Sequence, residues 1–197
     1  MKIVTISGTP GTGKTSVSKA IAEKLNAKLI SLNDLVIQKN FTTNYDSKRD
    51  TFIFNEKAVK KYLINLIESY EPEKVNYLLI ESHFSDIIPE KFIDFLIILR
   101  CHPDELSVRL RKKGYNEEKV IENVQSEILG NCINFFIKKD VKIPILEIDT
   151  TKLDIETLMR IIIEIITEEK NIDQYIVGKI DWLEDLFQQD RLGDFFD

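Results

Sequence analysis

The chain begins with eight residues whose types and spacing suit phosphate binding. Gly8 to Thr15 read GTPGTGKT and match G-x-x-x-x-G-K-[ST], between a β-branched run and an amphipathic segment. Glycines let the backbone curl so that successive N–H groups point at one anion, and the helix that follows adds its positive end. Lys14 would reach the β- and γ-phosphates, Thr15 would bind Mg²⁺, and the Ser16 hydroxyl would approach the α-phosphate. The pattern predicts a site for a nucleoside triphosphate.

An acid and a histidine follow a buried strand in the middle of the chain. The run Val75–Glu81 (VNYLLIE) is mostly apolar, and His83 comes two residues after Glu81. At the carboxyl end of a parallel strand beside a phosphate loop, a carboxylate can order Mg²⁺ through water. His83 could orient a water molecule or a phosphate. Because core packing does not require either side chain there, we predict a catalytic role for both.

The polar segment after the second strand could bind a second substrate. We predict that Asp34 holds magnesium-bound water or a substrate hydroxyl; the alternative is that it caps a helix. Tyr45 and Arg49 lie in the sequence NYDSKR and could supply base stacking and a phosphate contact. A solvated loop explains each of these two residues equally well.

Four basic residues lie at the end of a predicted helix over Pro103–Lys113. Positive charge there stabilises the negative end of the helix dipole, which is one explanation for Arg109, Arg111, Lys112 and Lys113. In a phosphoryl-transfer enzyme the same cluster can close over the γ-phosphate, exclude water and spread the transition-state charge. We therefore consider Arg109 and Lys113 as candidate catalytic residues.

The motifs of guanine-nucleotide hydrolases are missing. The sequence has no N-K-x-D, and its one D-x-x-G, Asp190–Gly193, lies near the C-terminal end and follows no strand. A guanine-specific hydrolase is therefore disfavoured.

Apolar runs that could position these residues alternate with amphipathic segments. We expect strands over 2–7, 27–31, 75–81, 94–100 and 143–148, and helices over 15–26, 56–70, 103–113, 117–139 (interrupted near Gly130) and 155–168. The stretch 33–54 is polar, and we expect it to be irregular. The alternation predicts an α/β fold with a parallel sheet covered by helices on both faces.

Composition limits the classes of partner. The chain has 197 residues, 43% hydrophobic and 30% charged, as in a globular domain. Its net charge of −6 argues against strong direct binding to nucleic acid or to an anionic membrane, and suits a basic protein partner. Two cysteines form no disulfide framework, and no leader or membrane span is evident, so we expect a cytoplasmic protein.

The last stretch has a different character. Asp181–Asp197 reads DWLEDLFQQDRLGDFFD and carries six acids against one base, Arg191. Its apolar residues could form one face of a helix. We expect a terminal helix that packs on the domain, with a partner-binding tail as the alternative.

Taken in order, several segments resemble the sixth adenylate kinase isoenzyme family, a CINAP-like group with archaeal members. These are GTPGTGKT, NYD, ESHF…PEKFIDFLIILR, RLRKKGYNEEKVIENVQSEI and TTK. The similarity spans about residues 1–168, and the block Lys112–Ile128 is particularly specific to this group. The resemblance implies a P-loop NTPase with a nucleoside-monophosphate-kinase-like five-stranded parallel sheet. It also implies an acceptor-binding segment at about 30–53 and a short lid at about 112–120; residues 169–197 form an acidic extension.

The resemblance also implies an activity and a setting. It implies transfer of phosphate from ATP, with Mg²⁺, to AMP or another nucleoside monophosphate, together with ATPase activity. It further implies a role in ribosome biogenesis and rRNA processing, through binding of a basic small-subunit ribosomal protein. The alternative is an ATPase assembly factor for a ribosomal protein with marginal kinase activity. A third, non-enzymatic alternative is a nucleotide-sensing binding module.

By position, the resemblance assigns individual roles. It gives ATP contacts to Gly11, Gly13, Lys14, Thr15, Ser16, Lys113 and Lys152. It places Glu81 and His83 in an acid-x-His motif whose acid is usually aspartate. Ile37 replaces an arginine that would meet the acceptor phosphate, and Asn55 replaces an acid. These last two departures predict weaker AMP phosphorylation more than weaker ATP binding, although Lys39 or Arg49 could supply the missing charge.

Overall fold

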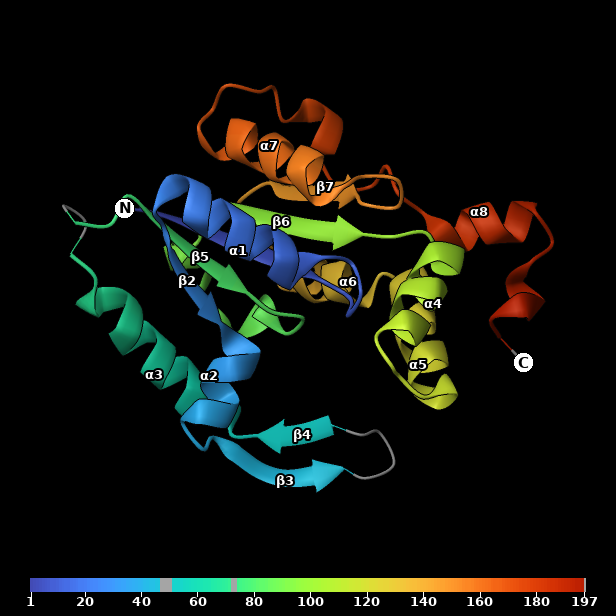
Figure 1. The fold of residues 1–197 in the computed structure, drawn as a ribbon, viewed down its shortest axis with the longest axis horizontal. Helices are drawn as coiled ribbons and strands as arrows, with labels where there is room; N and C mark the ends of the chain where they lie inside the picture. Colours follow the sequence, from blue (N-terminus) through green and yellow to red (C-terminus); the bar gives the residue numbers. More distant parts are fainter. Residues whose placement is uncertain (47–50, 72–73, 197) are drawn as a thin grey trace.

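The computed structural model describes residues 1–46, 51–71 and 74–196 (Figure 1). Five parallel strands form the central sheet of this part of the chain, in the order β2-β5-β1-β6-β7. Their bounds are β1 Lys2–Gly8, β2 Lys28–Ser31, β5 Tyr77–Glu81, β6 Phe95–Arg100 and β7 Ile145–Asp149. The five predicted strands and their parallel arrangement are confirmed.

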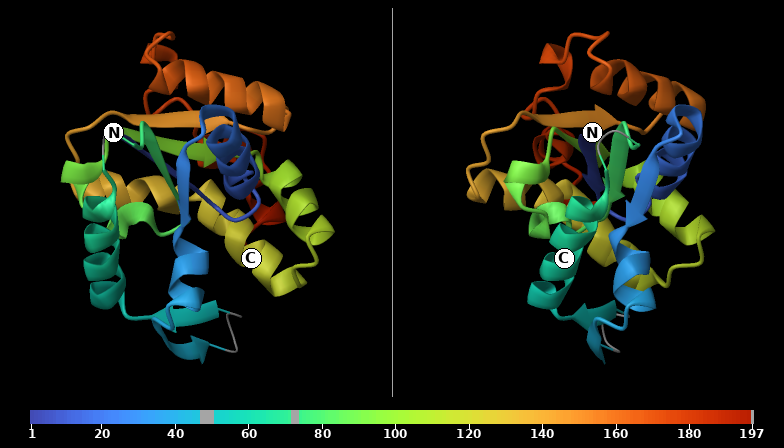
Figure 2. Two further views of the ribbon diagram at one scale, coloured as in Figure 1. Left: turned by 60° about the vertical axis from the view of Figure 1, so that its left-hand side comes forward. Right: turned by 90° about the vertical axis from the view of Figure 1, so that its left-hand side faces the viewer.

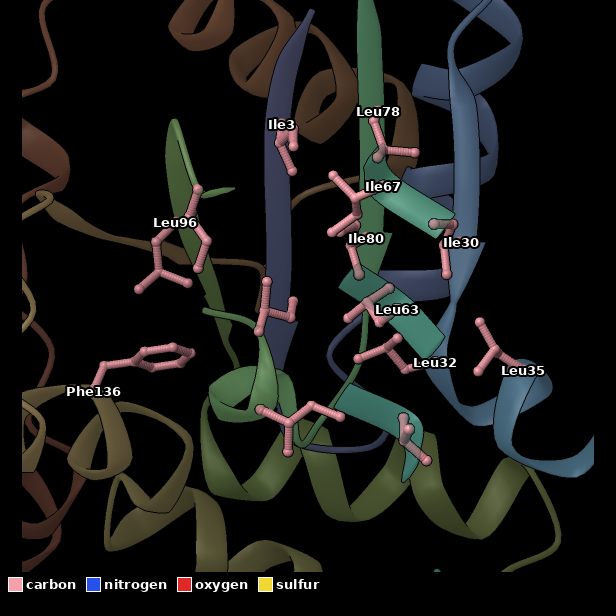
Figure 3. Close-up of a cluster of buried hydrophobic side chains, with 14 of the residues drawn as sticks. Ile3, Ile30, Leu32, Leu35, Leu63, Ile67, Leu78, Ile80, Leu96 and Phe136 are labelled. Carbon is pink, nitrogen blue, oxygen red and sulfur yellow. The ribbon is translucent and has the colours of Figure 1, made fainter. Parts of the chain in front are cut away.

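Helices cover both faces of the sheet (Figures 1 and 2). One face packs on α1 (Lys14–Leu25) and α7 (Ile155–Ile166), and the other on α2 (Leu32–Gln38), α3 (Glu56–Ser69) and α6 (Asn131–Lys138). Successive strand residues point to opposite faces, so Ile3 and Val4 belong to different clusters. Figure 3 shows the cluster of Ile3, Leu63, Ile80 and Phe136. Each fully buried side chain of this kind contributes about 1.5–3 kcal/mol.

Two further helices lie beyond the carboxyl ends of the strands. They are α4 (Pro103–Lys112) and α5 (Glu117–Ile128), and they pack against each other. The predicted interruption near Gly130 is confirmed, because Gly130 has a φ of 62° and separates α5 from α6. This left-handed turn redirects the chain from α5, beyond the ends of the strands, to α6, which packs on the face of the sheet.

The prediction that residues 33–54 are irregular was wrong. The segment contains most of α2, then a hairpin of β3 (Thr42–Asp46) and β4 (Thr51–Phe54) that projects away from the sheet (Figures 1 and 2). The helix begins because the Ser31 hydroxyl accepts a hydrogen bond from Asp34 N at 3.4 Å. Its buried residues, Leu32, Leu35 and Val36, follow helical spacing.

The C-terminal stretch packs on the domain, as expected. After a short 3₁₀ turn at Asp173–Tyr175, Val177 N donates to Ile145 O at 2.9 Å at the edge of the sheet. The helix α8 (Trp182–Gln188) then buries Trp182 and Leu186 against α4 and α5. Among the described residues, no helix combines the length and apolar character needed to cross a membrane.

Candidate functional site

A cavity of about 500 Å³ opens at the carboxyl ends of β1 and β5. The loop between β1 and α1 forms one side, and residues of α5 and α6 form another. Glu81 and His83, at and just beyond the end of β5, also line it, with Lys113 and Tyr115 from the turn after α4. This is where ligands bind in open parallel sheets.

The phosphate loop adopts its shape because two of its glycines have no room for a side chain. Gly8 has a φ of 139°, and a Cβ there would lie 2.4 Å from Leu99 O. Gly11 has a φ of 95°, and its Cβ would lie 2.7 Å from Leu106 Cδ1. The loop therefore curls tightly against β6 and α4, and α1 begins directly after it.

Lys14 lies at the centre of the loop and is 8% exposed. Its Nζ donates to Gly8 O at 2.7 Å and to Thr9 O at 3.0 Å. Burial lowers the pKa of Lys14 below its ordinary value. A nearby anion would stabilise the charged form of this buried amine, so the position suits a bound phosphate.

Thr15 and Glu81 place hydroxyl and carboxylate oxygens together beside Lys14. Thr15 Oγ1 lies 3.3 and 3.4 Å from the two Glu81 oxygens, and the Glu81 side chain is 4% exposed. Oxygen donors of this kind fit Mg²⁺. The described residues contain no group of three or more His, Cys, Asp or Glu side chains able to hold a metal. A Mg²⁺ here would therefore complete its shell with phosphate oxygens and water.

His83 borders the same cavity in a neutral form. Burial, and then the positive charges of Lys14 and Lys119, lower the pKa of His83 from 6.5 to about 4. Its Nδ1 lies 3.4 Å from Asn33 Nδ2, and its ring meets Phe84 edge-on. A neutral ring offers one donor and one acceptor, which suits orientation of a polar group.

This low pKa predicts a specific dependence of stability on pH. Between pH 6.5 and about 4 the unfolded chain binds a proton at His83 and the folded chain does not. Stability from the neutral ring is therefore present above pH 6.5 and is lost as the pH falls towards 4. We expect the unfolding free energy of the wild type to fall relative to that of His83→Gln across this window, measured by urea titration. Parallel curves for the two proteins would contradict the assignment.

The structure brings many of the predicted site residues together. Along the cavity described above lie Gly11, Gly13, Lys14, Thr15, Ser16, Glu81, His83 and Lys113. Asp34 instead faces a neighbouring cavity of about 340 Å³ that also contacts Thr15 and Glu81. The Tyr45 ring packs against Phe52 in the hairpin, with ring centroids 5.2 Å apart and the ring planes tilted by 54°. Arg49 lies outside the described residues.

Arg109 occupies a different place from the one its predicted role requires. It is absent from the described residues that line the main cavity. Its Nη2 donates to Thr150 O at 2.8 Å and to Thr151 O at 3.0 Å, while Nε binds Glu105 at 2.9 Å. Arg109 therefore holds the loop after β7, and the geometry does not direct it at a γ-phosphate.

Lys152 lies in that same loop, beside the phosphate loop. It lines a second cavity of about 530 Å³, together with His102, Val108 and Trp182. Thr150 Oγ1 donates to Thr12 O at 3.1 Å, which joins the two loops directly. The second cavity is therefore adjacent to the nucleotide candidate site.

Mostly polar residues on α5 and α6 complete the main cavity and were not among the predicted site residues. Those on α5 are Lys119, Glu122, Asn123 and Ser126; Asn131, Cys132 and Phe135 belong to α6. Lys119, Asn123 and Ser126 follow the spacing i, i+4, i+7, which puts them on one helix face. This spacing in the segment 117–128 was a signal that could have identified them.

Two of the solved structures with a similar fold are a shikimate kinase and a deoxyadenosine kinase. The shikimate kinase of Bacteroides thetaiotaomicron has a TM-score of 0.53 at 16% identity, covering 84% of this chain and 98% of that one. A deoxyadenosine kinase from M. mycoides has a TM-score of 0.54 at 19% identity, covering 85% and 100%. The fold is therefore that of the α/β P-loop kinases, as predicted.

Sequence comparisons define the family. Residues 4–130 match a family model described as an AAA domain. A Methanocaldococcus jannaschii protein named "Putative adenylate kinase" is 34% identical over 184 residues, covering 93% of this chain and 94% of that protein. A Methanosarcina acetivorans protein of the same name is 36% identical over 192 residues, covering 92% and 98%. This chain belongs to the AAA-domain family and is a homologue of these archaeal proteins.

Proposed function

We propose that this protein is a nucleoside monophosphate kinase that transfers the γ-phosphoryl group of MgATP to AMP or a related acceptor. The observation that carries the proposal is the convergence of Lys14, Thr15 and Glu81 on one cavity that extends to α5 and α6. The names of the archaeal homologues and the kinase fold of the structural neighbours support it. In this proposal the second substrate would bind on the side of the cavity that α5 and α6 form.

The residues at the site have distinct roles in this proposal. Main-chain amides of the phosphate loop and Lys14 bind the triphosphate and stabilise charge on the transferred group. Thr15 and, through water, Glu81 would hold Mg²⁺, which would neutralise charge on the phosphate oxygens. Lys113 covers the γ-phosphate from the lid, and neutral His83 orients the attacking group or a water molecule. No covalent intermediate is required, because positioning of the two substrates and stabilisation of the developing charge account for the acceleration of the reaction.

The base of ATP would lie in the second cavity. Lys152 and the loop held by Arg109 border it, next to the phosphate loop. We assign Lys152 to the adenine and Arg109 to the position of this loop. We also retain residues 30–53 as the acceptor-binding segment, 112–120 as the lid and 169–197 as a C-terminal extension.

A second candidate function is an ATPase assembly factor for the small ribosomal subunit, as in the isoenzyme-six group. The observation that favours it is Ile37, which is 54% exposed and supplies no charge for an acceptor phosphate. The net charge of −6 would suit a basic ribosomal protein, in the cytoplasm. Capture of purified basic small-subunit proteins in the presence and absence of ATP tests this function; no nucleotide-sensitive binding would count against it.

Calorimetric titration with a bisubstrate analogue, two adenosines joined by a polyphosphate chain, tests the kinase proposal. If ATP and AMP bind side by side at this site, the analogue should bind about 10²-fold more tightly than ATP, because its second contact is intramolecular. Mg²⁺ is present in both titrations, and AMP alone serves as the matched control. If the analogue bound no more tightly than ATP, the protein would have only one nucleotide site, and the kinase proposal would be wrong.

A further inference from the structure

A buried carboxylate next to the phosphate loop has no role in the proposed reaction. Glu127 lies in the last turn of α5, and its side chain is shielded from solvent. Among the described residues, it accepts hydrogen bonds from Arg100 Nε at 2.7 Å, Cys101 N at 3.1 Å, Trp182 Nε1 at 3.3 Å and Thr9 Oγ1. Arg100, Cys101 and Trp182 all donate to Oε1, and Thr9 donates to Oε2, so both oxygens of this buried carboxylate have partners. Its donors come from segments far apart in the sequence.

The same network reaches the C-terminal segment at a second point. Arg100 Nη1 binds Glu147 Oε1 at 2.6 Å, and Glu147 Oε2 accepts from Gly178 N at 2.7 Å. Arg100 also donates from Nη2 to Glu127 O at 3.0 Å. Charges removed from water are stable only when their partners are fixed in good geometry. The segment that carries Gly178 and Trp182 is therefore part of what holds Glu127 in place.

Thr9 connects this network to the nucleotide site. While its hydroxyl donates to Glu127, its carbonyl accepts from Lys14 Nζ at 3.0 Å and from Thr12 Oγ1 at 2.9 Å. Because the hydroxyl and the carbonyl belong to the same residue, the contact of the side chain with Glu127 also helps to fix the direction in which the carbonyl points towards Lys14 and Thr12. A continuous series of hydrogen bonds thus runs from Trp182 through Glu127 and Thr9 to Lys14.

We propose that Glu127 is a positioning residue that fixes the phosphate loop through Thr9, and that Trp182 of the C-terminal segment completes the nucleotide site. The proposal rests on the proposed function only in assuming that the loop binds ATP. It assigns a purpose to the stretch 169–197: docking of this stretch sets the geometry of a loop more than 150 residues earlier in the chain. It acts through the contact of Thr9 with Glu127, which are themselves 118 positions apart.

A double-mutant cycle on Thr9 and Trp182 tests the proposal without unpairing the buried charges. Thr9→Val keeps the shape of the side chain and removes the hydroxyl, and Trp182→Phe keeps an aromatic ring and removes the N–H donor. We expect Thr9→Val to weaken ATP binding about fivefold to tenfold and Trp182→Phe about threefold, by calorimetry. Thr9→Ser, which retains the hydroxyl, should restore the affinity to within about twofold. The double variant should lose less than the product of the two effects, because both act through one carboxylate.

Leu186→Val is the matched control. Leu186 is buried on the same helix as Trp182 and belongs to the same apolar cluster. This variant should lower the urea midpoint and leave ATP affinity unchanged, whereas a purely structural role for Trp182 would make the two variants behave alike. The proposal would be overturned if Thr9→Val bound ATP with wild-type affinity, or if the effects of Thr9→Val and Trp182→Phe multiplied fully in the double variant. The kinase assignment would still stand in either case, provided that the wild-type protein binds ATP. Failure of the wild type to bind ATP would overturn both.

Discussion

Lys14→Ala will lose phosphoryl transfer, with kcat reduced by about 10²–10³-fold, and will remain folded. The Nζ of Lys14 is buried between Gly8 O and Thr9 O, and a bound triphosphate would bring its oxygens to the same position. Removing the amine leaves the charge that develops on the transferred group without its buried cation. The measurement is ADP formation from ATP and AMP at saturating substrate, with circular dichroism as the test of folding.

The control for Lys14→Ala is Lys24→Ala. Lys24 is exposed in the last turn of the same helix, so its removal changes the charge and leaves the cavity intact. We expect Lys24→Ala to show wild-type kcat. If Lys14→Ala retained wild-type ADP formation, the loop would not be where the phosphoryl group is transferred.

Arg100→Met will lower the unfolding free energy by about 3–5 kcal/mol, the largest effect on stability that we expect from a single substitution. Arg100 is 3% exposed and pairs with Glu127 at 2.7 Å and Glu147 at 2.6 Å. Methionine fills much of the volume and leaves two buried carboxylates without their cation. Urea unfolding at neutral pH, followed by tryptophan fluorescence of Trp182, measures the loss.

The matched substitution at an exposed pair is Arg111→Met. Arg111 binds Glu117 at 2.5 Å on the surface, where water screens the charges. We expect its unfolding midpoint to stay close to that of the wild type. A loss below about 1 kcal/mol for Arg100→Met would mean that the buried charges relax into water, and the network would then not be rigid.

The central sheet could be predicted because its strands are buried on both faces. Runs such as Tyr77–Glu81 and Phe95–Arg100 are apolar at nearly every position, and helical periodicity separates them. The phosphate loop was equally readable, since its glycines and its lysine have fixed spacing. Local sequence therefore determined both the sheet and the side of the site that binds phosphate.

Other features depend on contacts between distant segments, which one sequence does not reveal. The hairpin β3–β4 has short, mostly exposed strands, so burial imposes no apolar alternation on it. Arg109 and Lys113 look alike in the sequence, yet Arg109 binds the loop after β7 while Lys113 lines the cavity. In the sequence, Arg100 is only a charged residue at the end of a strand. Its partners Glu127 and Glu147 become evident only in the folded structure.

Product analysis with MgATP and each nucleoside monophosphate tests the central claim most directly. The account predicts that ATP and AMP, or another monophosphate, are converted to diphosphates at a rate set by the acceptor, with little inorganic phosphate released. ³¹P NMR of the reaction mixture distinguishes the two products without a coupled assay. Release of inorganic phosphate at a rate indifferent to every monophosphate, with no nucleoside diphosphate formed from the acceptor, would contradict it.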